Sequence, residues 1–158
     1  MPTPTTPVKL LVWPIDERKL NLARHAHRPG EWDSWAYQRT TNPKYQKQWD
    51  AANFDARTVG YELWRRHFDN AAQVPDPIIR ISKRLGKPLW ENRFYREVQG
   101  KTYWWGIVVS FNAYLNTPPK KRARWLENLL KHELVHYAGR WHHKADFWRD
   151  LKAIGGSN

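Results

Sequence analysis

The chain has 158 residues, which is enough for one domain with its own hydrophobic core. It contains no cysteine, and this excludes both a disulfide framework and a metal site with thiolate ligands, leaving His, Asp and Glu as the strong metal ligands. The formal net charge is +12, which favours polyanions such as nucleic acids as partners.

The sequence predicts neither a membrane segment nor an export signal. No stretch approaches the roughly 18 to 20 apolar residues of a membrane span, and the opening MPTPTTP lacks the pattern of a signal peptide. We therefore expect a cytoplasmic protein, in which association with the nucleoid would fit the charge. Residues 1–50 mix charged and aromatic residues without a clear period and predict an N-terminal extension, followed by one domain over residues 51–158.

The first half of the chain predicts strands around one helix. Residues 8–15 are typical of a short extended segment, and Asn53 is a suitable N-cap for a helix that ends near residue 70. Residues 78–82 and 93–98 are predicted as strands, and residues 102–112, the most apolar and β-branched run, as a third. We expect this third strand to be central in the fold or to flank the active cleft.

Two helices are predicted in the last third. Thr117 can cap a long helix with Pro118 as its first residue, and Gly139 is a natural stop for it. A final helix over residues 144–154 has one apolar face. Together with the strands, these helices predict an α+β fold of the minimal zincin type, in which helices pack on a small, mainly antiparallel sheet.

The long helix contains the string HELVH, an HExxH motif formed by His132, Glu133 and His136. Its two histidines are four residues apart and therefore lie on one face of the helix, where both imidazoles can reach one zinc ion. Glu133 is rotated away from that pair and can contact a water molecule beside the metal, which suits a general base. The alternative is a surface helix without metal binding, whose two histidines and glutamate face solvent.

A catalytic zinc site needs a third protein ligand, and the candidates are His142, His143, Asp146 and Asp150. The 3.6-residue period places His143 on the apolar face of the last predicted helix, toward the motif, and His142 nearer the polar side. We prefer His143, with His142 as the alternative. Asp146 is a better candidate for the partner of a histidine than for a ligand.

His142 would complete the metzincin string HExxHxxGxxH, in which Gly139 also has its place. That arrangement needs a methionine turn downstream, and the single methionine of the chain is Met1. A thermolysin-like site is also disfavoured, because no glutamate follows Glu133 to act as the distant ligand.

Over roughly residues 55–155 the chain resembles the SprT-like, or Spartan-type, zinc metallopeptidases. The landmarks occur in the family's order: WRRHFDN, VPDPIIRIS, KRLG, GIVVSFN, LLKHELVHY and HKADF. The resemblance implies that His143 joins the two motif histidines on one zinc ion, that Glu133 is catalytic, and that the substrates are DNA-associated or DNA-crosslinked proteins. The sequence departs from the family at Lys144, where Gly is frequent, and lacks the C-terminal zinc ribbon of some members.

Basic residues gather at the start of the long helix, where the helix dipole disfavours cations, and an anionic partner would explain them better. More of them follow the strand predicted at residues 78–82, and aromatic residues such as Tyr103 and Trp104 could stack on unpaired bases. The candidate contacts to single-stranded or distorted DNA are Lys120, Lys121, Arg122, Arg124, Lys83, Arg84 and Lys87. The alternative is a solvated basic face with the tryptophans in the core.

The sequence thus predicts a zinc-dependent endopeptidase whose protein or peptide substrate extends along the strand at residues 106–112. Two other functions stay open. One is a nucleic-acid-binding protein with a structural, fully ligated zinc ion, and the other is a general intracellular metallopeptidase without DNA dependence.

Overall fold

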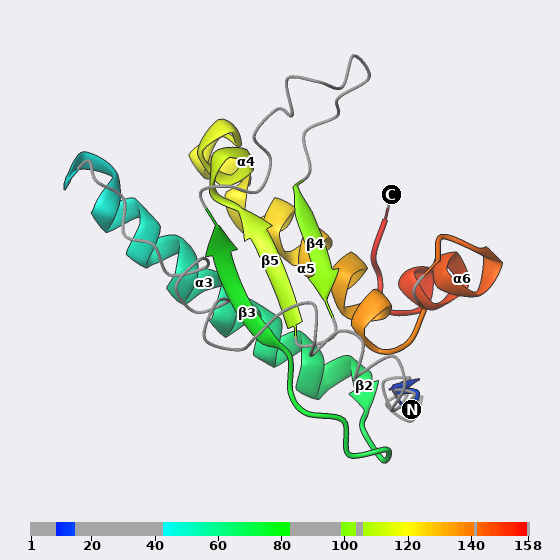
Figure 1. Ribbon diagram of the computed structural model, residues 1–158. Helices are drawn as coiled ribbons and strands as arrows, with labels where there is room; N and C mark the ends of the chain where they lie inside the picture. The colour runs from blue at the N-terminus through cyan, green and yellow to red at the C-terminus, as the bar shows by residue number, and fades with distance from the viewer. Residues whose placement is uncertain (1–8, 15–42, 83–98, 104–105, 141, 158) are drawn as a thin grey trace, which may run out of the picture.

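The computed structural model of the protein describes residues 9–14, 43–82, 99–103, 106–140 and 142–157. Its elements in chain order are β1 (Leu10–Leu11), α3 (Pro43–His67), β2 (Phe68–Asp69), β3 (Ile78–Ser82), β4 (Gly100–Tyr103), β5 (Gly106–Ser110), α4 (Phe111–Asn116), η1 (Pro119–Lys121), α5 (Arg122–Tyr137) and α6 (Ala145–Ala153) (Figure 1). This part of the chain is therefore α+β, as predicted, with helices and small mixed sheets. None of its helices has the length and apolar character needed to span a membrane.

The larger sheet has three strands in the order β3-β5-β4. β3 runs parallel to β5, with Ile78 opposite Gly106, whereas β4 runs antiparallel to β5, with Gly100 opposite Val109. The sheet is therefore mixed, and the prediction of a mainly antiparallel sheet is wrong. The connections explain the difference: β4 and β5 follow each other closely and pair antiparallel, while the chain from β3 to β5 is long enough to cross over.

Residues 102–112 form two strands and the start of a helix, so the prediction of one long strand is wrong. β4 ends at Tyr103, and β5 begins at Gly106. Ser110 ends β5 because its hydroxyl accepts a 3.1 Å hydrogen bond from the Ala113 N–H and caps α4. The ends of β4 and β5 could not be recognised in this apolar run, because a strand buried on both faces lacks the alternation of polar and apolar residues that marks its limits.

β5 lies in the middle of the sheet, and all five of its residues are buried. Its backbone pairs with β3 on one side and β4 on the other, which leaves no edge for another strand. The prediction that a substrate extends along residues 106–112 is therefore wrong. β4 is an edge strand of the sheet as described, and it packs on α5 (Figure 1). The strand predicted at residues 93–98 lies outside the described residues.

Helix α3 begins at Pro43, and the predicted N-cap Asn53 lies in its middle, so that prediction is wrong. Asn53 is buried and bridges two elements instead. Its side-chain oxygen accepts a 3.0 Å hydrogen bond from the Ile81 N–H of β3, and its amide donates to the Trp49 carbonyl at 3.1 Å. Trp49 is buried edge-on against another aromatic ring. The helix crosses the predicted boundary between residues 50 and 51, and Trp49, which precedes that boundary, is already part of the core.

The long helix α5 begins later than predicted. Thr117 was expected to cap it, but its N–H and hydroxyl donate to the Ala113 carbonyl at 3.1 and 2.8 Å and end α4 instead. The 3₁₀ turn η1 follows, and α5 begins at Arg122. The strand at residues 78–82 and the last helix are confirmed, the latter within one residue at each end.

We expect Asn53→Ala to lower the free energy of unfolding by about 1–3 kcal/mol, because the Ile81 N–H would be buried without its acceptor. Denaturant titration followed by circular dichroism measures this change. The matched control is Phe54→Ala on the exposed side of the same helix, which should change stability by no more than about 0.5 kcal/mol. Equal effects of the two substitutions would contradict the bridging role of Asn53.

Candidate metal centre

Helix α5 presents His132 and His136 on one face because they are four residues apart. The opposite face is anchored in the core by Leu126, Leu130 and Leu134, each at most 2% exposed. The rotation of the helix is therefore fixed, and the two imidazole rings lie 4.9 Å apart between their centroids. The packing of α5 thus holds the pair toward the start of α6.

His143 completes a group of three histidines from the turn that precedes α6. Its Nε2 lies 3.0 Å from Nε2 of His132 and 3.0 Å from Nε2 of His136. All three ligand atoms lie within 4.8 Å of one another, so this group could hold a metal ion. His142 is exposed and is not part of the group. The structure thus brings together the two motif histidines and the preferred third candidate.

The orientation of His136 is set by a hydrogen bond on the far side of its ring. Nδ1 lies 2.7 Å from the Arg140 carbonyl oxygen, which can only accept, so Nδ1 carries the proton. The lone pair of the neutral ring is then on Nε2, which faces the other two histidines. This tautomer is the one that a metal ligand at Nε2 requires.

Arg140, which sequence reasoning missed, is held by residues from both ends of the described chain. Its Nε donates to Asp150 of α6 at 2.9 Å, and its guanidinium lies 4.4 Å from the ring centroid of Trp13. Both members of the Arg140–Asp150 pair are about 15% exposed at their side chains. The Trp13 N–H also donates to the Ala138 carbonyl at 2.7 Å. Asp150 and Asp146, considered as ligands from the sequence, thus both face Arg140.

Gly139 allows this close approach of the N-terminal segment. Its φ is +131°, a conformation that other residues rarely adopt, and a Cβ there would lie 2.7 Å from the Trp13 Cβ. The natural stop predicted from the sequence therefore has a second role, since it makes room for the tryptophan that supports Arg140.

Phe147 forms the apolar base of the histidine group. It is fully buried, and its ring lies 4.8 Å from His132, 4.4 Å from His136 and 5.0 Å from His143 between centroids. Trp148 stacks on His143 from the solvent side at 5.4 Å. These rings restrict the rotamers of the three imidazoles, which favours a preorganised site.

Glu133 is buried beside the histidines and is linked to β4. The Thr102 hydroxyl lies 2.5 Å from Glu133 Oε2 and 3.0 Å from the Glu133 backbone carbonyl. Burial raises the pKa of the Glu133 carboxyl from 4.5 to about 7, and the hydrogen bond from Thr102 opposes part of this shift. A carboxyl with a pKa near neutrality can both accept and return a proton at physiological pH.

The pKa values of His132 and His136 are lowered, whereas that of Glu133 is raised. Burial, with the positive charges of His136 and His143 as smaller causes, lowers the pKa of His132 from 6.5 to about 4. Burial also lowers the pKa of His136, although its hydrogen bond to Arg140 opposes this. Both rings are therefore neutral at pH 7, as metal ligation requires.

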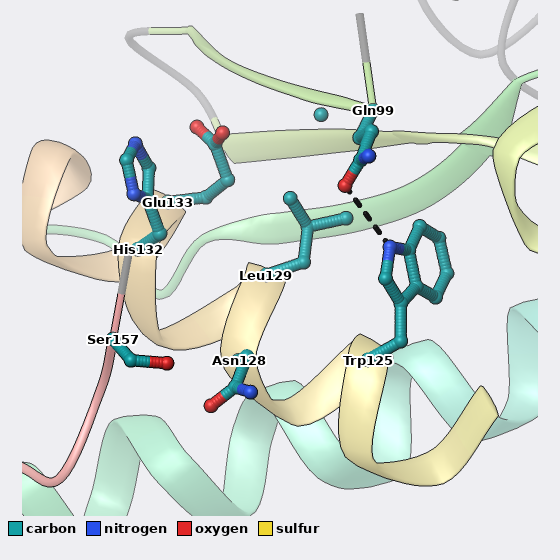
Figure 2. A pocket seen from close by; sticks show the side chains of 8 residues that line it. Gln99, Trp125, Asn128, Leu129, His132, Glu133 and Ser157 are labelled. Atoms are coloured by element: carbon teal, nitrogen blue, oxygen red, sulfur yellow. Dashed lines mark hydrogen bonds between the residues drawn. The ribbon is translucent and has the colours of Figure 1, made fainter. Parts of the chain in front are cut away.

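A pocket of about 400 Å³ opens next to the carboxylate (Figure 2). Figure 2 shows Glu133 and His132 at one end, Trp125 hydrogen-bonded to Gln99 at the other, and Leu129 between them. Its lining consists of Gln99, Gly100, Trp125, Asn128, Leu129, His132, Glu133 and Ser157. This pocket was not predictable from the sequence, because its walls come from β4, α5 and the residues after α6.

The residues predicted to contact nucleic acid have different environments. Lys120, Lys121 and Arg124 are exposed around the start of α5. Arg122 is half-buried, and its guanidinium donates to the backbone carbonyls of Tyr114, Leu115 and Thr117, so it stabilises the end of α4. Lys83, Arg84, Lys87 and Trp104 lie outside the described residues, and Tyr103 is half-buried.

We expect the wild-type chain to bind one divalent metal ion, and His143→Ala to weaken this binding by more than about 100-fold. The loss of a direct ligand should cost more than the roughly 10–100-fold that the loss of a ligand's hydrogen-bond partner costs. His142→Ala, which removes a neighbouring exposed imidazole, is the matched control and should keep the wild-type affinity. Calorimetric titration of the metal-free proteins measures both values. Equal losses in the two variants would contradict the assignment of His143.

In the metal-free protein, Glu133 and His132 should change stability with pH in opposite directions. Folded Glu133 keeps its proton up to about pH 7, whereas the unfolded chain releases it near pH 4.5, so its contribution to stability falls as pH rises through this range. Folded His132 gains a proton only near pH 4, whereas the unfolded chain gains one near pH 6.5, so its contribution rises with pH.

Glu133→Gln removes the first of these contributions. The difference in unfolding free energy between this variant and wild type should rise by about 3 kcal/mol in favour of the variant from pH 4.5 to pH 7, and then level off. Denaturant titrations at a series of pH values, with a chelator present, measure it. A difference that is constant over this range would show that the Glu133 pKa is not raised in the folded state.

Comparison of the chain with protein-family models, with curated proteins and with solved structures found no match. The function therefore has to be argued from the chemistry of the site itself. The histidine group, the buried carboxyl and the pocket beside them are the features from which that argument starts.

Proposed function

We propose that the protein is a zinc-dependent endopeptidase in which His132, His136 and His143 hold one ion and Glu133 is the general base. The observation that carries this proposal is the convergence of three imidazole Nε2 atoms beside a buried carboxyl that lies on the same helix as two of them. Three neutral nitrogen ligands with room for a further ligand are typical of catalytic rather than structural zinc.

The donor set and its spacing fit zinc. Tetrahedral coordination with Zn–N bonds of 2.0–2.1 Å places ligand nitrogens roughly 3.3 Å apart. The nitrogens of the two pairs that include His143 are 3.0 Å apart, and small rotations of the rings would bring them to the required separation. The Nε2 atoms of neighbouring neutral imidazoles can share at most one N–H between each pair, so a cation that accepts a lone pair from all three satisfies them better than they satisfy each other.

Zinc, when bound, lowers the pKa of a coordinated water from 15.7 toward about 7 and polarises a substrate carbonyl. Glu133 accepts a proton from the attacking water and gives it to the nitrogen of the peptide bond that breaks. The products are an amine and a carboxylic acid, whose proton then passes to the amine, so that a carboxylate and an ammonium group result. In the metal-free chain, burial raises the pKa of this carboxyl to about 7. Thr102 holds the carboxyl in place from β4 without supplying a charge.

We assign the fold to the minimal zincins and the chain to the SprT-like metallopeptidases as part of the same proposal. Its support is the position of the family's landmarks on the elements: WRRHFDN ends α3, GIVVSFN contains β5, and LLKHELVHY is the second half of α5. HKADF contains the third histidine and leads into α6.

The edge of β4 with which no described strand pairs is the proposed binding site for the substrate backbone. Gly100 and Thr102 face α5, because a Cβ on Gly100 would contact Leu129 and the Thr102 hydroxyl contacts Glu133. An extended peptide paired with β4 would therefore pass directly beside Glu133. Backbone pairing of this kind recognises an extended chain with little dependence on its sequence.

The proposed substrates are proteins bound or crosslinked to DNA. The support is the net charge of +12 and the exposed cations Lys120, Lys121 and Arg124. At 1.5 Å per residue, the start of α5 lies roughly 15 Å from His132. A nucleic acid bound there would lie on the same helix as the proposed metal ligands and would hold its protein partner near them.

We expect Glu133→Gln to bind zinc as wild type does and to cleave a disordered protein such as casein about 10²–10⁴-fold more slowly, because the proton acceptor is lost. Metal analysis and a gel-based cleavage assay on the same preparation measure the two properties. The matched control is Glu127→Gln, which removes an exposed carboxylate from the same helix and should leave cleavage unchanged.

The same assay separates this proposal from its rivals. If the zinc-loaded wild type cleaves nothing, the assignment of Glu133 as the base fails, and a structural metal is favoured. If Glu133→Gln cleaves as fast as wild type, the assignment of the base also fails. Cleavage that single-stranded DNA leaves unchanged, with no salt-sensitive DNA binding, would select a general metallopeptidase.

A further inference from the structure

We propose that Trp13 is a positioning residue for the metal centre, and that metal binding and the docking of the N-terminal segment, residues 9–14, strengthen each other. Trp13 acts through Arg140, whose carbonyl orients His136. This inference rests on the metal centre of the proposed function. It assigns control of the metal affinity to a segment that lies far from the three histidines in the sequence.

Backbone hydrogen bonds hold the N-terminal segment against two other parts of the chain. β1 pairs in parallel with β2, and the Val12 N–H extends this pairing by donating to the Asp69 carbonyl at 3.0 Å. The Trp13 N–H then donates to the Ala138 carbonyl at 2.7 Å. Val12 is 1% exposed, whereas Trp13 is 48% exposed. The segment therefore joins β2 to the end of α5 and leaves the Trp13 ring at the surface.

The Trp13 ring covers the guanidinium of Arg140. Its centroid lies 4.4 Å from the guanidinium carbon, which is within the range of a cation–π contact. Two carboxylates of α6 also face the guanidinium, Asp150 at 2.9 Å and Asp146 at 3.6 Å. The side chain of Arg140 is only 15% exposed. Removal of the ring would admit water to these ion pairs and weaken them, because the attraction between charges falls as the surrounding dielectric constant rises.

The position of the Arg140 backbone matters because its carbonyl is the hydrogen-bond acceptor for His136 Nδ1, at 2.7 Å. The preceding residue, Gly139, has a φ of +131°, and a turn that contains glycine is not fixed by its own backbone preferences. The contacts of the Arg140 side chain are therefore needed to hold its carbonyl in place. Without them the imidazole would rotate more freely, and Nε2 would face the other two histidines for less of the time. The loss of such a partner typically costs about 10–100-fold in metal affinity.

Thermodynamic linkage makes this effect reciprocal. If the docked segment raises the affinity for the metal by some factor, the bound metal must stabilise the docked segment by the same factor. Docking means here that the hydrogen bonds of Val12 and Trp13 are formed. A residue with a purely structural role would lower the stability of the metal-free fold and leave the metal affinity unchanged. Metal affinity and segment docking are therefore the two properties that distinguish positioning from structural support.

The first test compares the Zn²⁺ affinities of full-length variants by competition with a chromophoric chelator. Trp13→Ala should weaken Zn²⁺ binding by about 10-fold or more, because Arg140 loses its support. Trp13→Phe keeps a ring over the guanidinium and should recover the affinity to within about 3-fold of wild type. The matched control is Leu11→Ala, which truncates an exposed side chain of the same segment and should change the affinity by no more than about 2-fold.

The second test measures hydrogen exchange of the Trp13 amide by NMR. In wild type, saturation with Zn²⁺ should slow this exchange by about the factor in affinity that Trp13→Ala loses. In His143→Ala, which lacks one proposed ligand, the same Zn²⁺ concentration should leave the exchange rate of the Trp13 amide unchanged. Exchange that Zn²⁺ does not slow in wild type, at a concentration that saturates the site, would contradict the coupling.

Asp150→Asn removes the charged partner of Arg140 in α6 and gives an independent variant if Trp13→Ala does not fold. It should also bind Zn²⁺ about 10-fold more weakly than wild type. Wild-type affinity in either folded variant would overturn the inference, although the peptidase function would stand. An equal loss in Leu11→Ala and Trp13→Ala would overturn it as well, because the effect would then belong to the segment and not to the ring. If wild type binds no Zn²⁺, the proposed function fails and this inference fails with it.

Discussion

The hydrogen bond between His136 and the Arg140 carbonyl is the contact on which the metal centre depends. It occupies the Nδ1 proton at 2.7 Å and so turns the lone pair of Nε2 toward the other two histidines. Arg140 is fixed in turn by Asp150 of α6 and by the ring of Trp13. The orientation of this one imidazole therefore depends on three parts of the chain: the segment after β1, the turn after α5, and α6.

The centre concentrates groups that are unfavourable together in the absence of a cation. Three imidazoles face one another, and a carboxyl with a raised pKa is buried next to them. Local arrangements of this kind, which reduce stability, are expected at functional sites and are supported by the surrounding packing. Here that support comes from Phe147 beneath the rings and from the leucines of α5. A bound cation would relieve the arrangement and so stabilise the folded state.

Local spacing was enough to predict much of this centre, whereas contacts between distant segments were not predictable. Two histidines four residues apart and a third on the apolar side of the last helix follow from the helical period, and these three meet. Arg140, Trp13 and Thr102 were missed, because nothing in the sequence signals which strand or turn will reach the helix. The same limit explains the fold: helix periods were visible, but strand order and the tertiary role of Asn53 depend on pairing across the chain.

The strand order also explains how one short strand reaches both the pocket and the carboxyl of Glu133. Because β3 pairs with β5, the antiparallel partner β4 is displaced to the edge, directly over α5. Gly100 and Thr102 then face the helix, where one leaves the pocket open and the other holds the carboxyl of Glu133. The opposite face carries Lys101 above the Tyr103 ring. A peptide paired with this edge, as proposed, would therefore run beside the carboxyl of Glu133, because alternate residues of β4 face the helix.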